Sequence, residues 1–257
     1  MPNTALITGA SGGIGRALAD YHAARGGDLI LVARSGDALA AAKAEIEAKH
    51  SVSVHIFTQD LGVTGGAQAL VTAVEDAGLN VDILINNAGF GGRGAHTDRA
   101  LDDEHAMIDL NIKALVTLTH AFGRKMAANG GGKIMQVGST AGFMPGPQQA
   151  VYFATKAFVN SFSQAVDAEL RGKGVTSTVL APGYVETGFA ARADLTGTKL
   201  TKSGATAQSV AKCGYDAMMA GQLVAINERA LGFVINWIIP LLPRRLALKI
   251  IGDMQTK

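Results

Sequence analysis

The chain has 257 residues, of which 48% are hydrophobic, and its formal net charge at pH 7 is +2. This length suits one α/β domain with a large core, and the small charge excess gives no basic patch for nucleic acid. The single cysteine, Cys213, excludes an intrachain disulfide and fits a reducing compartment. The six histidines are scattered and none has a metal-ligand spacing with Cys213 or acids, so no metal site is expected.

A glycine-rich turn between a strand and a helix comes first. Residues 4–8 form a short apolar run, residues 9–15 read Gly-Ala-Ser-Gly-Gly-Ile-Gly, and residues 16–25 are predicted to be helical. Missing Cβ atoms let the backbone approach a pyrophosphate, and the helix N-terminus supplies N–H donors. The unit therefore predicts a dinucleotide phosphate site. A strand starting at residue 4 also leaves no room for a signal peptide.

The end of the second expected strand, residues 28–33, bears on the choice of cofactor. NAD sites usually have an acid here, roughly 20 residues past the glycines, to hold ribose hydroxyls. Ala33 occupies this place, and Arg34 with Ser35 would receive a 2′-phosphate. The sequence therefore favours NADP over NAD. The alternative is that Arg34 is a solvated loop cation.

Strands and helices alternate along the rest of the chain. Further strands are expected at 52–57, 81–85, 133–137, 175–180 and 223–227. Further helices are expected at 37–50, 64–78, 100–128, 152–170 and 205–220. This alternation indicates a doubly wound, Rossmann-type parallel sheet with helices on both faces and ligands at the carboxyl ends of the strands. We expect one such domain over residues 1–257.

Tyr152 and Lys156 lie four residues apart, so their side chains share one face of a helix. A free phenol has a pKa near 10, and a neighbouring ammonium is expected to lower the pKa of Tyr152 toward the working range. By itself the pattern is common in ordinary helices. Ser139 precedes Tyr152 by thirteen residues, at the end of a strand, which is enough for a loop to bring the two together.

The segments after the sixth strand are expected to bound a substrate pocket. Residues 188–204 are small, polar and irregular, which is typical of a mobile lid. Five candidate pocket residues are mostly apolar, so a small hydrophobic carbonyl or alcohol substrate is expected; the alternative is that they only pack loops. They are Phe90, Phe143, Met144, Tyr184 and Phe189.

Residues 230–257 form an apolar C-terminal helical extension. Residues 231–242 are too short to span a bilayer and are interrupted by Pro240, and Arg244, Arg245 and Lys249 follow. We expect residues 231–242 to fold beside the lid and shape the substrate entrance, with reversible membrane contact as the minority alternative. The protein is accordingly expected to be cytoplasmic, and peripheral membrane association stays open.

Two helices carry more apolar surface than one sheet face can cover. The helix at 100–128 is apolar nearly all round, and Phe158 and Phe162 extend the apolar surface of the helix at 152–170. These helices predict a homodimer or homotetramer joined through them.

Over about residues 4–187 the chain resembles the short-chain dehydrogenase/reductase family. Four signals stand in the family's order: the glycine turn, the run 86–89 (Asn-Asn-Ala-Gly), Ser139 ahead of Tyr152 and Lys156, and Pro182-Gly183. The resemblance implies an NADP(H)-dependent oxidoreductase that interconverts a carbonyl and an alcohol. The alternative is a catalytically idle NADP-sensing or scaffold protein, and an epimerase or dehydratase is favoured less.

The resemblance also implies roles for single residues. Tyr152 would be the general acid or base, and Ser139 would hydrogen-bond the substrate oxygen. Lys156 would depress the pKa of Tyr152 and hold the nicotinamide ribose, and Asn111 would anchor a water of the proton relay. The implied cofactor contacts are Thr8, Gly9, Ser11, Gly12, Gly13, Ile14, Gly15, Arg34, Ser35, Asp60, Leu61, Asn87, Ala88, Gly89, Tyr152, Lys156, Pro182, Gly183, Val185 and Thr187.

Overall fold

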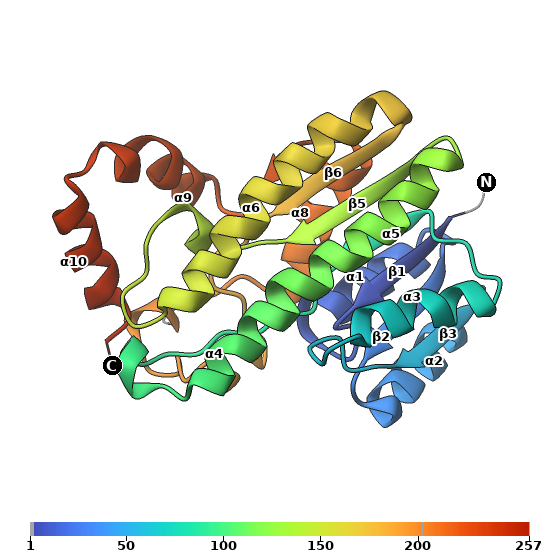
Figure 1. The fold of residues 1–257 in the computed structure, drawn as a ribbon, viewed down its shortest axis with the longest axis horizontal. Helices are drawn as coiled ribbons and strands as arrows, with labels where there is room; N and C mark the ends of the chain where they lie inside the picture. Colours follow the sequence, from blue (N-terminus) through green and yellow to red (C-terminus); the bar gives the residue numbers. More distant parts are fainter. Residues whose placement is uncertain (1–2, 202, 257) are drawn as a thin grey trace.

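The computed structural model describes residues 3–201 and 203–256, which surround a seven-stranded parallel sheet (Figure 1). The strands stand in the order β3-β2-β1-β4-β5-β6-β7. The order along the chain reverses between β1 and β4, and such a switch point opens a crevice at the carboxyl ends of the strands. The Rossmann-type fold expected from the sequence is confirmed.

The strands agree closely with the expected segments. They are β1 (Thr4–Thr8), β2 (Asp28–Ala33), β3 (Val54–Thr58), β4 (Ile83–Asn86), β5 (Gly132–Val137), β6 (Val175–Leu180) and β7 (Val224–Ala225). In the centre of the sheet Ile7 stands in register with Leu31 on one side and Ile85 on the other. Successive side chains of β1 and β2 point to opposite faces and are buried on both, as expected of a parallel sheet covered on two sides.

Helices cover both faces of this sheet. One face is covered by α1 (Gly13–Ala23), α2 (Gly36–Lys49) and α8 (Ala207–Met219), which share a buried cluster with one set of strand residues. The other face is covered by α3 (Gly66–Asp76), α5 (Leu115–Ala128) and α6 (Ala150–Leu170) (Figure 1). The short helical turns are η1 (His96–Asp98), η3 (Thr140–Phe143), η4 (Arg171–Lys173) and η5 (Lys199–Thr201).

The helix expected at 100–128 is not uniform. It consists of α4 (Leu101–Ile108), a π-helical segment η2 (Asp109–Ala114) and α5. The wider π turn contains Asn111, which is buried and bonded to neighbouring segments rather than to solvent. Such π turns within helices often mark functional sites.

A buried polar network ties β4 and β5 to α5. Thr119 Oγ1 accepts hydrogen bonds from Asn86 Nδ2 at 3.0 Å and from Gln136 Nε2 at 2.8 Å. Asn86 Nδ2 also donates to Gln136 Oε1 at 3.0 Å. All three side chains are buried, so each bond replaces one that water would otherwise supply. The network fixes the end of β4 just before the run 87–89.

The C-terminal segment forms an arm at one end of the molecule (Figure 1). It contains α9 (Arg229–Phe233), a π-helical segment η6 (Val234–Ile238), the turn η7 (Ile239–Leu241) and α10 (Arg244–Met254). In α10 the residues that face the body are Ala247 and Ile251, and most of the others are exposed. Within the described part of the chain, no helix has the length and apolar character to cross a membrane.

Candidate active site

One cavity of about 660 Å³ opens at the carboxyl ends of the central strands. The residues that line it come from the segments after β1, β2, β3, β4, β5 and β6 and from the start of α6. The sequence-predicted residues that line it are Gly9, Ser11, Gly12, Gly13, Ile14, Arg34, Asp60, Leu61, Asn87, Ala88, Gly89, Ser139, Tyr152, Lys156, Pro182, Gly183, Val185 and Thr187.

Four predicted residues do not line the cavity. Thr8 Oγ1 accepts hydrogen bonds from the backbone N–H groups that follow β4, each at 3.0 Å. Gly15 is packed on the carbonyl of Gly9, and Ser35 caps α2 by accepting a bond from the N–H of Ala38. Asn111 is the fourth of these residues.

The glycine turn forms a cradle that side chains would fill. Gly9 has a φ of +66°, and a Cβ added there would lie 2.8 Å from Asn87 Nδ2. Asn87 Nδ2 donates to the carbonyl of Thr8 at 2.8 Å and so binds the turn to the loop after β4. The N-cap of α1, Gly12, makes no side-chain hydrogen bond, so the first N–H groups of the helix stay available for an anion. These features fit the diphosphate of a dinucleotide.

Tyr152 and Lys156 are buried on the first two turns of α6. Lys156 Nζ donates to the carbonyl of Val137 at 2.8 Å and lies 5.9 Å from the centre of the Tyr152 ring. Burial raises the pKa of Tyr152 to about 12, and the smaller effect of a hydrogen bond with the Ser139 side chain opposes this shift. Burial lowers the pKa of Lys156 to about 8.

The lowering of the Tyr152 pKa expected from the sequence is therefore wrong in direction for the protein alone. A neighbouring ammonium favours the phenolate, whereas removal of the phenol from water disfavours it. The ammonium of Lys156 binds a backbone carbonyl, not the phenol, so desolvation is the larger effect. Tyr152 is thereby held as a neutral phenol, and its proton stays in place.

Asn111 connects the π-helical segment to the loop after β4. Its side-chain amide donates to the carbonyl of Phe90 at 2.9 Å and to Thr155 Oγ1 at 3.1 Å. Its Oδ1 accepts the N–H of Phe90 at 3.1 Å. A Cβ added at Gly89 would lie 2.9 Å from that oxygen and 3.5 Å from Lys156 Nζ, so Asn111 and Lys156 flank the same glycine.

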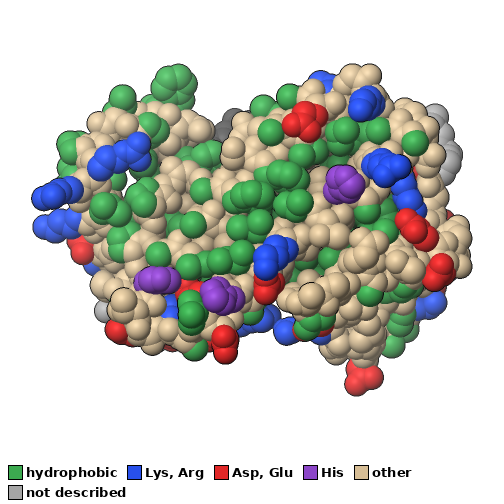
Figure 2. Space-filling model, in the orientation of Figure 1, with side chains coloured by type: hydrophobic (Ala, Val, Ile, Leu, Met, Phe, Trp, Pro, Cys, Tyr) green, Lys and Arg blue, Asp and Glu red, His purple; other side chains and the backbone are tan. Residues whose placement is uncertain are grey.

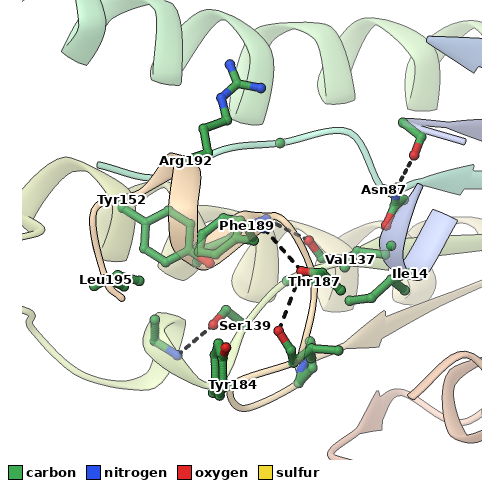
Figure 3. Close-up of a pocket in the computed structure, with 18 of the residues that line it drawn as sticks. Ile14, Asn87, Val137, Ser139, Tyr152, Tyr184, Thr187, Phe189, Arg192 and Leu195 are labelled. Atoms are coloured by element: carbon green, nitrogen blue, oxygen red, sulfur yellow. Dashed lines mark hydrogen bonds between the residues drawn. The ribbon is translucent and has the colours of Figure 1, made fainter. Parts of the chain in front are cut away.

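The segment after β6 folds over the cavity. It contains α7 (Phe189–Arg192) and η5, and its residue 202 lies outside the described residues. The centres of the Phe189 and Tyr152 rings are 5.4 Å apart, and the two labelled side chains lie next to each other in Figure 3. Arg93 donates its N–H to the carbonyl of Ala193 at 3.1 Å and pairs with Asp194 at 2.7 Å. The segment thus contacts both α6 and the loop after β4.

Arg192 is a cavity residue that the sequence reading missed. Its side chain extends from α7 away from Ser139 and Tyr184 (Figure 3), and its guanidinium lies 4.4 Å from the centre of the Phe90 ring. Burial and then repulsion from Arg34 lower the pKa of Arg192, and Asp60 opposes them. Neither guanidinium has a carboxylate at ion-pair distance within residues 3–201 and 203–256.

The remaining wall of the cavity is mainly apolar. Of the five pocket candidates, Met144, Tyr184 and Phe189 line it, whereas Phe90 and Phe143 do not. Phe90 stacks under Arg192 instead. Further apolar side chains that line it are Phe153, Leu195, Leu200, Leu231, Ile251 and Met254; of these, Leu195 and Leu200 lie in the expected lid and Leu231 in the expected entrance segment. Their spacing carries no signal, because they come from four separate segments.

The C-terminal arm reaches the cavity by a different part than expected. Of residues 231–242 only Leu231 lines the cavity, and the end of α10 does the rest with Ile251, Met254 and Gln255. Gln149, just before α6, donates from Nε2 to Gln255 Oε1 at 2.6 Å, and both side chains are buried. The part of the arm that lines the cavity therefore lies mostly later in the chain than expected, because it is the last turn of α10 and the residue after it that reach the cavity.

Comparison with known proteins gives consistent matches. The family model described as short chain dehydrogenase matches residues 3–196. Sulfoacetaldehyde reductase of Chromohalobacter salexigens is 42% identical over 193 residues, which are 74% of this chain and 75% of that protein. A short-chain dehydrogenase from Sphingobium yanoikuyae, solved in complex with NADPH, superposes with a TM-score of 0.83 at 29% identity, covering 94% of this chain and 97% of the other. A bulky-bulky ketone specific alcohol dehydrogenase from Comamonas testosteroni gives 0.78 at 26%, covering 94% and 95%.

Proposed function

This chain belongs to the short chain dehydrogenase family and is an oxidoreductase of CH–OH groups; on that premise we propose that it interconverts a hydrophobic carbonyl compound and its alcohol with NADP(H). The observation that carries the proposal is the meeting of Ser139, Tyr152 and Lys156 in one cavity with the glycine turn. A binding protein has no use for a buried phenol beside a buried amine. The domain boundaries 1–257, with 188–204 as a lid, remain part of the proposal.

In carbonyl reduction Tyr152 holds the proton that the substrate oxygen receives. Its pKa of about 12 keeps the phenol protonated at neutral pH, so the proton is present when negative charge develops on that oxygen. The Ser139 hydroxyl hydrogen-bonds the same oxygen. Lys156, with a pKa of about 8, titrates near neutral pH and stabilises the phenolate that remains. The bound cofactor supplies the hydride in reduction and accepts it in oxidation.

The cavity also favours a cofactor with an extra phosphate. Arg34 and Arg192 line the cavity from the end of β2 and from α7, repel each other, and have no carboxylate at ion-pair distance within the described residues. An anion between two guanidiniums removes that repulsion. This supports NADP over NAD, with Arg34 as a 2′-phosphate ligand; the alternative is that Arg34 stays a solvated loop cation.

The substrate side of the cavity favours an apolar molecule. Met144, Phe153, Phe189 and Ile251 surround the space beside Tyr152. The substrate in the name of sulfoacetaldehyde reductase is a small anion, and this apolar wall offers few polar groups that could bind an anion. The name of the Comamonas enzyme, for bulky ketones, agrees better with this wall. We therefore infer a bulky hydrophobic ketone or its alcohol.

A homodimer or homotetramer in the cytoplasm is the assembly we favour. Hydrophobic side chains gather over α5 and α6 on the face shown in Figure 2. On α6 the Phe158 and Phe162 rings are stacked with centres 5.5 Å apart, and Phe158 remains 38% exposed. An apolar face of this kind is usually covered by another chain.

The test is Tyr152→Phe, which removes only the hydroxyl. We expect kcat for a bulky ketone to fall by about 10²–10⁴-fold while the Kd of NADPH stays unchanged. Tyr184→Phe makes the same change at another tyrosine of the cavity and should stay near the wild-type rate. Retention of more than about half of the activity by Tyr152→Phe removes its role as proton donor. A wild-type protein that binds NADPH and turns over no ketone or alcohol is the scaffold alternative.

A further inference from the structure

The C-terminal arm, residues 229–256, exposes apolar side chains that the body does not cover. Trp237 is 67% exposed and Leu241 is 83% exposed. The other large hydrophobic side chains exposed on the arm are Phe233, Val234, Ile238, Leu246, Leu248, Ile250 and Met254. Single exposed hydrophobic residues are normal, but a run of them on one projecting segment indicates a surface that binds something.

Basic residues accompany this apolar surface. Arg244, Arg245 and Lys249 are exposed on α10. From residue 230 to residue 256 the sequence contains a single acid, Asp253. Figure 2 shows hydrophobic and basic side chains together on the lobe that corresponds to the arm in Figure 1. The arm is therefore apolar and cationic at once, which complements an anionic lipid surface.

A bilayer fits these features better than a second copy of the chain. Across a two-fold axis the cations of one arm would face those of the other, and the sequence of the arm offers one acid to pair with them. The exposed aromatic residues, Trp237 and Phe233, are of the type that settles at the boundary between lipid and water. With eleven residues α10 is suited to lie in that boundary, not to cross the membrane.

The same arm forms part of the cavity wall. Leu231, Ile251 and Met254 line the cavity, and Met254 is also 41% exposed. The side chain of Met254 therefore connects the outer apolar surface with the space beside Tyr152. We propose that the C-terminal arm docks on an anionic lipid bilayer and that a carbonyl substrate dissolved in the bilayer enters the cavity at the edge formed by α10. The second part of this statement rests on the proposed function.

Docking is tested with the full-length protein and vesicles of phosphatidylcholine, with or without phosphatidylserine. We expect sedimentation with the anionic vesicles and much less with the neutral ones. The variant Trp237→Asp/Leu241→Asp should lose binding, whereas the control Val63→Asp, at a 54% exposed site in the loop after β3, should keep it. Arg244→Glu/Arg245→Glu should weaken binding to anionic vesicles by at least about 25-fold, from about fivefold per basic residue.

Two results overturn docking. One is a wild-type protein that sediments with neither vesicle. The other is a Trp237→Asp/Leu241→Asp variant that sediments like the wild type. If the wild type binds no vesicle and the light-scattering mass of the Trp237→Asp/Leu241→Asp variant is lower than that of the wild type, the surface binds a second copy of the chain instead.

Substrate entry is tested by turnover of a long-chain ketone and a short, water-soluble ketone. Anionic vesicles should raise kcat/KM for the long-chain ketone loaded into them by at least about tenfold relative to the variant Trp237→Asp/Leu241→Asp. Both proteins should turn over the short ketone equally, since neither residue lines the cavity. Equal rates on the loaded ketone refute entry from the bilayer. Absence of turnover of both ketones by the wild type refutes the proposed function instead, and leaves the docking result standing.

Discussion

Removal of the two cavity arginines tests the cofactor assignment most directly. Arg34 follows β2, Arg192 belongs to α7, and both line the cavity. Arg34→Ala, Arg192→Ala and the double variant remove one or both guanidiniums without changing a packed core residue, because both side chains are exposed. NADPH and NADH differ only by the 2′-phosphate, so the ratio of their Kd values isolates the contacts to that group.

The expected changes in Kd follow from the contacts that the two guanidiniums can make with the 2′-phosphate. A charge-assisted contact contributes about 1.5–3 kcal/mol, so Arg34→Ala should raise the Kd of NADPH by about 10–150-fold. For NADH we expect a change of less than about threefold, in the range of a surface charge effect. Arg192→Ala should weaken NADPH as well, and either substitution relieves the repulsion between the two guanidiniums that lowers the Arg192 pKa in the free protein. In the double variant the two losses should not add.

The assay is isothermal titration of each variant with both cofactors at fixed ionic strength. Arg124→Ala, at an exposed position of α5 that does not line the cavity, controls for the change in net charge. Equal losses of NADPH and NADH in Arg34→Ala contradict a 2′-phosphate contact. An unchanged Kd for NADPH would make Arg34 a solvated loop cation.

Three other predictions concern the fold, the proton and the assembly. Thr119→Val removes the acceptor of Gln136 Nε2 and one of the two acceptors of Asn86 Nδ2, so urea denaturation should give an unfolding free energy lower by about 2–4 kcal/mol. Thr119→Ser keeps the hydroxyl and should lose less than half of that. In carbonyl reduction kcat/KM should fall as pH rises through about 8, where Lys156 loses its proton while Tyr152 keeps its own; a rate that stays flat from pH 7 to 10 refutes this role. Phe158→Glu/Phe162→Glu should shift the light-scattering mass to 26.5 kDa, and an oligomer that persists would place the interface elsewhere.

Much of the cofactor-binding part of the cavity was predictable, because the sequence patterns that identify it are local. The glycine turn at 9–15, the apolar strand before it and the helix after it are adjacent in the chain, so periodicity and the absence of Cβ atoms identify them. Asn87 and Gly89 follow a strand of the same parallel sheet, whose carboxyl ends must share one edge. The order of these motifs was enough to recognise the family and to expect an oxidoreductase, and both expectations are confirmed.

Only the tertiary structure decided the properties that depend on distant segments. The pKa of Tyr152 is set by how fully other segments exclude water, which a Tyr-x-x-x-Lys spacing does not record. Arg192 and the end of α10 are part of the cavity because separate segments fold over the same sheet edge. No periodicity links them, since contact across that distance comes from packing, not from helix or strand geometry. The sequence by itself determined the strand, glycine turn and helix that form the cofactor side of the cavity. Packing decided how far water is excluded from the substrate side, which charged side chains line it and which segments enclose it.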